Sequence, residues 1–341
     1  MATIKQIAEK AGVSPTTVAN VIHGRTAKVS PSTLERVRSF LSSEKYAPNM
    51  GAIMLARSSS RIIGVVIFRE PRRNETVLED PFSSMIIGAI EREIREAGYY
   101  MMLHTTDHEE DILKLVAKWK LAGLILIWVT GEMAGILQRS LETPVVFIDC
   151  IFDDDGQEYH NVALDDEQGG YELTKYLLSM GHRRIAYFAD SGTWPGTATM
   201  RFEGAKRAYA ELALSLPDDG FKILSKDYDE RQKTYGQLTV SGPPYTALAF
   251  FSDYYAAEAV IYCQEHGIEV PGRVSVTGFD DNIFARMVRP RLTTVYQDAF
   301  LRGHQAVTML LALIRGEKLD TPSVRAPVSL KIRDSVGRVS E

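Results

Sequence analysis

Residues 3–22 read TIKQIAEKAGVSPTTVANVI, and this stretch sets how the N-terminal part of the chain folds. Its apolar residues recur every three or four positions on both sides of Gly12, as on one face of each of two helices. Gly12 lies where a helix C-cap is needed, and Ser14 followed by Pro15 is typical of the start of a second helix. Two short helices joined by a tight turn predict a helix-turn-helix, although two generic packed helices would give a similar pattern.

The second of these helices has an exposed face of short, polar side chains. Solvated helix faces usually carry Lys and Glu, whereas short polar side chains suit close approach to the edges of DNA bases. The face consists of Pro15, Thr16, Thr17, Ala19 and Asn20.

Charge is distributed unevenly along the chain. Residues 1–60 contain eight Lys and Arg against three Asp and Glu, so they carry +5 and leave −10 on the rest of a chain whose net charge is −5. A basic segment on an acidic body is what phosphate binding by one domain requires. Ordinary scatter of charge would give the same numbers, so charge alone leaves nucleic-acid binding open.

Composition limits the class of protein. A chain of 341 residues suggests two or three domains, and 45% hydrophobic with 24% charged residues is typical of a soluble globular protein. The longest apolar runs, such as 62–68 and 121–129, are too short to span a bilayer, and the N-terminus lacks the apolar stretch of a signal peptide. Cys150 and Cys263 lie in apolar surroundings without metal-ligand spacing. We therefore expect a cytoplasmic protein with no membrane partner, reduced core cysteines, no metal and no cofactor.

Specific motifs continue beyond the first two helices. Thr3 and Gln6 fit a capping box, Ser30-Pro31 predicts the start of a third helix, and Asn49 predicts the cap of a very short fourth helix. The motifs are I-x-x-IA-x-x-AGVS-x-x-TV from Ile4, VS at 29–30, Y-x-PN at 46–49 and A-x-x-L at 52–55. Their order and spacing resemble the head and hinge of the LacI/GalR family of bacterial regulators.

The resemblance implies that the second helix lies in the major groove, with Pro15, Thr16 and Asn20 at positions that read bases. The family usually has arginine where Asn20 stands and frequently serine where Ala19 stands. Arginine favours guanine, whereas an asparagine amide pairs with adenine. We therefore expect the operator to differ from that of relatives with arginine at the position that Asn20 faces. The further candidate DNA contacts are Thr3, Ser14, Thr17, His23, Ser30, Asn49, Ala52 and Leu55.

The short segment after Asn49 is expected to be a hinge helix. A helix from Met50 to Ala56 is too short to be stable alone in water, so it should order when two copies meet on DNA. Leu55 matches the family's leucine lever, which enters the minor groove and kinks a base step. In a protein that does not bind DNA, Leu55 would be an ordinary linker residue.

From Arg61 on, apolar runs alternate with amphipathic stretches, and the cycle restarts after His160. Repeated βα units predict an α/β fold with parallel, doubly wound sheets in two similar subdomains, like a periplasmic binding protein. The predicted strands are 62–67, 100–103, 123–129, 145–148, 184–189, 247–251, 274–278, 293–297 and 324–331. The predicted helices are 82–98, 109–119, 167–180, 198–213, 254–266 and 300–315. The expected domains are a head (1–48), a hinge (49–60), an N-terminal subdomain (61–159 with 292–321) and a C-terminal subdomain (160–291 with 322–341).

Polar residues follow several predicted strands, where ligands of doubly wound sheets bind. The family resemblance extends to this core through GHRRIA at 181–186, RF-x-G at 201–204, GFDD at 278–281 and P-x-LTTV at 290–295. It implies a set of effector contacts, namely Phe82, Asp149, Arg201, Ser252 and Asp280, and Trp194 is a further candidate. Arg201 with Asp280 could grip vicinal hydroxyls, and Phe82 or Trp194 could stack on a ring.

Other polar residues of this part are expected to stabilise the structure and not to bind a ligand. Asp253 and Asp281 are expected to cap helices, and His182 to be a structural residue at the surface.

The leading hypothesis is a DNA-binding transcription regulator, a repressor that binds a pseudo-palindromic operator as a homodimer. A small-molecule effector, most plausibly a sugar or sugar derivative, would control it allosterically, with a purine-like metabolite as the alternative. A cytoplasmic solute-binding protein would use the same core but has no need of the head. An enzyme is not expected, because the sequence shows no Walker loop, metal-ligand cluster or nucleophile elbow.

Overall fold

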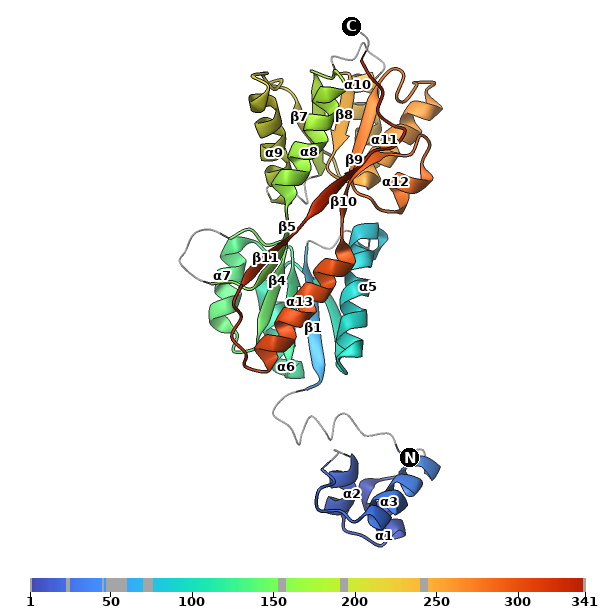
Figure 1. Cartoon of the computed structure of the whole chain (residues 1–341), viewed down its shortest axis with the longest axis vertical. Coiled ribbons are helices and arrows are strands. Elements are labelled where there is room, and N and C mark those ends of the chain that lie inside the picture. The colour runs from blue at the N-terminus through green and yellow to red at the C-terminus, as the bar shows by residue number, and fades with distance from the viewer. Residues whose placement is uncertain are drawn as a thin grey trace. The chain divides into compact units, whose positions relative to one another are not determined.

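The computed structural model describes residues 2–22, 25–44, 46, 60–69, 76–152, 158–190, 196–239 and 245–339. The chain divides into two compact units, residues 1–60 and residues 61–341, which are described separately (Figure 1). The predicted hinge helix, residues 50–56, lies outside the described residues. No helix among the described residues is both long enough and apolar enough to cross a membrane.

The first unit contains the predicted helix-turn-helix. Its described helices are α1 (Ile4–Ala11), α2 (Pro15–Ile22) and α3 (Pro31–Ser43). The capping box is confirmed, because the backbone N of Gln6 donates to Thr3 Oγ1 at 3.3 Å and the backbone N of Thr3 donates to Gln6 Oε1 at 2.8 Å. Gly12 ends α1 at φ 63°, a left-handed conformation that favours glycine. Ile7, Val18 and Val37, one from each helix, are fully buried and hold the three together.

The second unit is built on two six-stranded sheets. The first has the order β11-β5-β4-β3-β1-β2 and the second the order β12-β10-β9-β8-β6-β7. The strands of the first sheet are β1 (Ile62–Phe68), β2 (Tyr100–Thr106), β3 (Gly123–Ile127), β4 (Val145–Ile148), β5 (Asn161–Leu164) and β11 (Ser323–Ala326). Those of the second are β6 (Ile185–Asp190), β7 (Phe221–Leu224), β8 (Ala247–Phe250), β9 (Ser275–Asp280), β10 (Thr293–Gln297) and β12 (Val328–Lys331). Every strand pair is parallel except β10 with β12, which confirms the predicted doubly wound α/β class.

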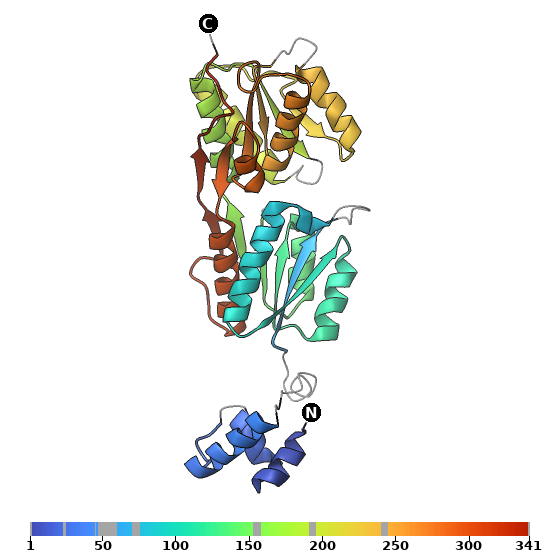
Figure 2. The same ribbon diagram turned by 90° about the vertical axis from the view of Figure 1, so that its right-hand side faces the viewer.

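Helices cover both faces of each sheet (Figures 1 and 2). On the first sheet, α5 (Pro81–Glu96) and α13 (Ala299–Ile314) pack on one face, and α6 (Glu109–Trp119) and α7 (Gly131–Ser140) pack on the other. The second sheet has α8 (Asp166–Ser179) and α9 (Thr197–Glu211) on one face. Its other face carries α10 (Tyr228–Thr239), α11 (Asp253–Glu265) and α12 (Ile283–Met287). We call the first sheet with its helices the first lobe, and the second sheet with its helices the second lobe.

The chain crosses between the lobes three times, and each crossing corrects a predicted boundary. β5 belongs to the first lobe, so the first crossing comes after Leu164 and not at residue 160. β10 belongs to the second lobe, although residues 292–321 were expected in the first. β11 belongs to the first lobe, and Pro327 separates it from β12 in the second, so the single strand predicted over residues 324–331 is wrong. Strand partners are set by tertiary packing, which the alternation of apolar residues does not encode.

Several short elements were missed by the sequence pattern, namely α7, β5, β7, α10 and α12. α10 shows the reason: of its twelve residues only Tyr235 and Leu238 are buried and apolar, too few for a visible helical stripe. Cys150 and Cys263 are free and buried, as predicted.

The crossing of α8 over α9 depends on two glycines. A Cβ added at Gly170 would lie 1.8 Å from the Arg201 carbonyl oxygen, and one added at Gly204 would lie 1.9 Å from the Glu167 carbonyl oxygen. Both neighbours are backbone atoms, so the two helices would have to separate. The glycines therefore permit the close approach that places Arg201 at the lobe boundary.

We expect Gly204→Ala to lower the free energy of unfolding of the second unit by about 2–3 kcal/mol, because the added methyl overpacks this crossing. Urea denaturation followed by tryptophan fluorescence measures the effect. The control is Gly88→Ala in α5, where an added Cβ meets nothing within 4 Å. The control should be neutral or stabilising by up to about 1 kcal/mol, and equal effects of both substitutions would contradict the assignment.

Candidate functional site

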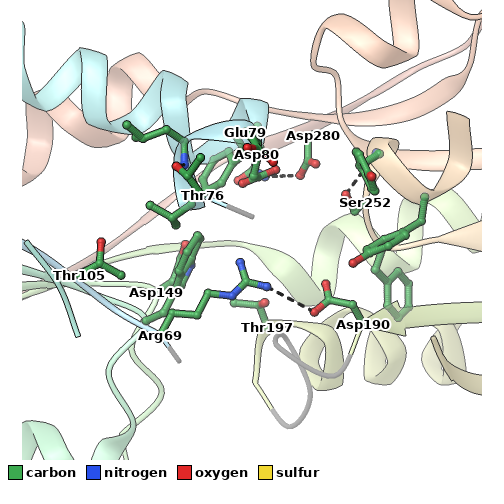
Figure 3. A pocket seen from close by; sticks show the side chains of 18 of the residues that line it. Arg69, Thr76, Glu79, Asp80, Thr105, Asp149, Asp190, Thr197, Ser252 and Asp280 are labelled. Carbon is green, nitrogen blue, oxygen red and sulfur yellow. Dashed lines mark hydrogen bonds and ion pairs between the residues drawn. The ribbon is translucent and has the colours of Figure 1, made fainter. Parts of the chain in front are cut away.

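A cavity of about 430 Å³ lies between the two lobes, within the second unit. It is formed at the carboxyl ends of strands from both sheets, where open α/β sheets bind ligands (Figure 3). The lining residues that end or directly follow a strand are Arg69, Trp128, Asp149, Asp190, Phe251, Asp280 and Gln297. The remainder of the wall includes the turn before α5 and the first turns of α9 and α11.

The backbone at this edge is unusual. Trp128, Asp149 and Asp280 line the cavity with φ angles of 62°, 55° and 122°, which non-glycine residues rarely adopt. Such conformations cost about 1–3 kcal/mol each and occur preferentially at functional sites. Three of them in one cavity, two from the first lobe and one from the second, indicate that the strand ends of both sheets are shaped to present these side chains.

The structure brings together five of the six predicted effector residues. Phe82, Asp149, Arg201, Ser252 and Asp280 all line the cavity. Trp194 lies outside the described residues. That these residues touch an effector remains a prediction.

Arg201 is held by protein partners as well as facing the cavity. Its Nε donates to Asp166 Oδ1 at 2.8 Å and its Nη1 to the Phe251 carbonyl oxygen at 2.5 Å. Its guanidinium lies 3.6 Å from the centre of the Phe279 ring. Burial raises the pKa of Asp166 to about 6, and the neighbouring Arg201 opposes this rise. Part of the donor capacity that was predicted to grip an effector is therefore used inside the protein.

Asp280 is a buried carboxyl group at the end of β9. Gln297 Nε2 donates to its Oδ1 at 2.5 Å. Burial raises the pKa of Asp280 to about 7, Arg201 lowers it, and the negative charge of Asp80 raises it further. Asp80 belongs to the first lobe, so the two carboxylates meet across the cavity (Figure 3).

A chain of hydrogen bonds joins the lobes beside the cavity. Arg302 in α13 donates Nη2 to Asp149 and donates Nη1 to Gln297 Oε1 at 2.9 Å, and Gln297 in turn donates to Asp280. The Arg302 guanidinium also lies 5.5 Å from the centre of the Phe82 ring. Arg302 is fully buried, and it fixes three of the predicted site residues.

Three structural expectations need correction. Ser252 caps α11 by accepting from Tyr254 N at 3.3 Å, whereas Asp253 lies inside the helix and accepts from Thr294 Oγ1 at 2.6 Å. Asn282 caps α12, and Asp281 instead accepts from Arg333 Nη2 at 2.6 Å.

His182 is structural but not at the surface. It is 2% exposed, between Thr246 and the Gly337 carbonyl oxygen. In all three cases a tertiary partner replaces the local role that the sequence suggests.

Several cavity residues were missed by sequence reasoning. Arg69 directly follows β1, Trp128 directly follows β3 and Asp190 ends β6, so the strand-end rule applied to every strand would have found them. Arg69 Nη2 lies 3.8 Å from Asp190 Oδ1, which joins the two lobes across the cavity (Figure 3). Tyr254 and Tyr255 begin α11, and no local pattern marks them as part of a cavity wall.

The first unit carries the second predicted site. Pro15 and Thr16 are exposed on α2, and Thr17 and Asn20 are half-buried beside them. Ser14 caps α2 by accepting from Thr17 N at 3.1 Å. The remaining described candidates, Thr3 and Ser30, cap α1 and α3. The other predicted DNA contacts lie outside the described residues, namely His23, Asn49, Ala52 and Leu55.

A helix-turn-helix head and a two-lobed core with a cavity between its lobes define the class of regulator that binds DNA and a small molecule. Comparison with known proteins agrees. Residues 3–49 match the model of bacterial regulatory proteins of the lacI family, and residues 174–336 match that of periplasmic binding protein-like domains.

Related proteins match over nearly the whole chain. The HTH-type transcriptional regulator GalR of Salmonella typhimurium (strain SL1344) is 31% identical over 329 residues, which cover 95% of this chain and 92% of GalR. The repressor PurR of Vibrio parahaemolyticus is 29% identical, with full coverage of both chains. A lac repressor dimer bound to operator and the anti-inducer ONPF has a TM-score of 0.85 at 25% identity, with 98% of this chain and 99% of that one covered.

This chain belongs to the lacI family of bacterial regulatory proteins. It is a DNA-binding transcription regulator and not an enzyme.

Proposed function

We propose that the chain is a cytoplasmic repressor that binds a pseudo-palindromic operator as a homodimer and is controlled by a sugar or sugar derivative in the interlobe cavity. The observation that carries this proposal is the position of the cavity at the carboxyl ends of both sheets, where one ligand can contact both lobes. A ligand that binds one lobe arrangement better than another shifts the population towards it, and a shift in the core is what an allosteric regulator needs.

The lining chemistry supports a polyhydroxyl ligand. Asp149, Asp280 and Thr105 offer oxygen atoms that accept hydrogen bonds from hydroxyl groups, and the ring of Phe82 or Trp128 offers an apolar stacking surface. Among the relatives, three are HTH-type transcriptional regulators named GalR. One solved structure is of a CelR–cellobiose complex, which has a TM-score of 0.71 at 24% identity and supports the fold alone. A purine-like metabolite is the second candidate, because the same rings could stack on a base and PurR is among the relatives.

The surface of the second lobe supports the homodimer. Ile261 in α11 and Ile283 and Met287 in α12 are 48%, 50% and 69% exposed. Large apolar side chains exposed on adjacent helices are typical of association surfaces. A second copy of this chain related by a twofold axis would place two heads on two half-sites.

The direct test is a competition experiment on the operator. The operator is first selected from random DNA with the full chain, and sugars, polyols and nucleobases are then added to the complex. We expect at least one sugar to change the operator affinity by about 5–150-fold, the usual range of allosteric coupling. A response only to nucleobases would favour the purine alternative. A stable monomer on a single half-site would contradict the homodimer.

The reading helix gives a separate prediction. We expect Asn20→Arg to change the preferred base at one position of each half-site from adenine to guanine, with a discrimination of about 1–3 kcal/mol. The physical reason is that an asparagine amide donates to and accepts from adenine, whereas arginine donates two hydrogen bonds to guanine. Operator selection with both proteins measures the change.

Ser39→Arg is the matched control, since it adds the same charge at an exposed position of α3. The control should raise affinity for all sequences without changing the preferred base. An unchanged preference in Asn20→Arg would remove Asn20 from the base-reading set.

A further inference from the structure

Among the residues that the structure describes, more acidic than basic side chains line the cavity between the lobes. The acidic residues that line it are Glu79, Asp80, Asp149, Asp190 and Asp280, and the basic ones are Arg69, Arg201 and Arg231. The excess of acidic side chains makes the cavity negative only if the arginines are already neutralised by other carboxylates. Their partners therefore decide what charge the cavity presents to a ligand.

Each of the three arginines has a carboxylate of its own. Arg201 is paired with Asp166, and Arg69 lies 3.8 Å from Asp190. Arg231 makes two bonds of 2.8 Å to the carboxylate of Glu258, and its Nη1 donates to the carbonyl oxygens of Ser225 and Lys226. All three nitrogens of the Arg231 guanidinium are therefore occupied, so it cannot clamp a phosphate in the usual bidentate manner.

The carboxylates are not balanced in the same way. Asp149 is paired with Arg302, which leaves Glu79, Asp80 and Asp280 as lining carboxylates without an ion pair among the described residues. Asp80 accepts from Ser83 N and Ser83 Oγ through Oδ2 as the N-cap of α5. A helix N-terminus offsets only about half a charge. Among the described side chains, the excess of negative charge therefore persists after the cap is counted.

Two of these carboxylates face each other across the cavity. Asp80 comes from the first lobe and Asp280 from the second (Figure 3), and the charge of Asp80 raises the pKa of Asp280. Like charges at such a place repel when the lobes approach, unless a positive charge lies between them. A cation in this position would hold the lobes together instead.

Aromatic rings provide a second and independent indication. Among the described residues, five aromatic side chains line the cavity, namely Phe82, Trp128, Phe251, Tyr254 and Tyr255. Three already have an arginine over the ring: Arg302 lies 5.5 Å from the centre of Phe82, Arg69 5.7 Å from that of Trp128 and Arg231 5.3 Å from that of Tyr255. A cavity of ring faces and carboxylates is suited to an ammonium group, which both attract.

We propose that the effector carries a positively charged amine on its sugar or polyol frame, and that this amine binds between Asp80 and Asp280. The inference rests on the proposed function, in that the cavity is taken to be the effector site. It disfavours phosphorylated and carboxylated sugars, whose negative charge would meet Glu79, Asp80 and Asp280, while each of the three described arginines of the cavity already faces a carboxylate.

The test is isothermal titration calorimetry on the full chain at pH 7. Glucose, galactose and mannose are each titrated as the neutral sugar, the 2-amino-2-deoxy sugar and the 6-phosphate, together with the acyclic amines ethanolamine and putrescine. We expect at least one amino sugar to bind roughly tenfold or more tightly than its neutral parent, as a charged hydrogen bond provides, and no 6-phosphate to bind more tightly than its parent.

Asp80→Asn tests the position of the amine. Asparagine caps a helix as well as aspartate does, so α5 keeps its N-cap while the charge is removed. The variant should lower the preference for the amino sugar to less than about threefold, since one of the two charged partners is lost. Glu96→Gln removes an exposed carboxylate at the other end of the same helix and should leave the preference unchanged. A preference that survives Asp80→Asn would overturn the placement.

The outcomes separate this inference from the proposed function. Tighter binding of a 6-phosphate, or the failure of every amine to bind more tightly than the neutral sugars, would overturn the inference and leave a sugar effector standing. Binding of the acyclic amines without any sugar would support the amine position between Asp80 and Asp280 and overturn the sugar or polyol frame. No binding by any compound in the panel would contradict both.

Discussion

Replacing Arg302 by leucine should lower the free energy of unfolding of the second unit by about 3–5 kcal/mol. Arg302 is fully buried and bonded to Asp149 and Gln297, so its loss leaves the buried carboxylate of Asp149 without its ion pair. Removing one member of a buried ion pair costs this much because the remaining charge is neither solvated nor paired. Leucine fills part of the space and cannot donate.

Urea denaturation of the full chain measures the effect. The three tryptophans, Trp119, Trp128 and Trp194, all belong to the second unit, so their fluorescence reports its unfolding separately from the head. Arg139→Leu, at an exposed position of α7, is the matched control and should change stability by less than about 0.5 kcal/mol. Adding Asp149→Asn to Arg302→Leu should restore part of the loss, because the buried charge is then gone. A loss of less than about 1 kcal/mol in the single variant would show that Arg302 does not stabilise Asp149.

Asp280→Asn should have the opposite effect to Arg302→Leu and raise the free energy of unfolding by about 2–4 kcal/mol at pH 8. Burial and the charge of Asp80 raise the pKa of Asp280 from 3.8 to about 7 in the folded protein. A carboxyl group with a raised folded-state pKa favours folding below its unfolded pKa, and this contribution is lost as the pH rises through the folded value. Each pKa unit is worth about 1.4 kcal/mol, so a rise of roughly three units corresponds to about 4 kcal/mol, the upper end of the stated range.

The sign of this change in the free energy of unfolding is tested by urea denaturation at pH 5 and pH 8. The stability of the unchanged protein should fall between these values, and that of Asp280→Asn should fall less. Asp166, with a pKa raised to about 6 by burial, accounts for part of the remaining fall in both proteins. Asp218→Asn removes an exposed carboxylate and serves as the control. Destabilisation by Asp280→Asn at pH 8 would mean that Arg201 stabilises the Asp280 charge more than burial opposes it.

Together the two variants describe a site in which one buried carboxylate has an ion pair and the other has none among the described residues. Arg302 supplies one positive charge for Asp149, whereas Asp280 faces Asp80 and has a glutamine as its direct hydrogen-bond partner. A buried carboxyl group without an ion pair lowers stability, and such a cost is typical of a site shaped for a ligand. The stabilised Asp280→Asn protein should therefore respond less to effector.

The sequence by itself determined the helices of the head and the location of most of the buried strands. Thr3, Gly12 and Ser30 act on backbone groups within four residues, so the caps predicted from them are the caps observed. The buried strands are continuous apolar runs, and the residue after each run lies at the carboxyl edge of a sheet whatever its neighbours are. Asp149, Ser252 and Asp280 could therefore be placed together in advance.

Only the tertiary structure decided which strands share a sheet and what each site residue is bonded to. β5, β10 and β11 pair across crossings between the lobes, and pairing of this kind depends on packing between distant segments. Arg302 lies on α13, 153 residues from the Asp149 that it neutralises. Charges and pKa values in the cavity depend on such partners and on exclusion of water, because electrostatic interactions are strong where solvent is absent. The sequence supplies the charged groups, and the fold determines which of them remain unbalanced.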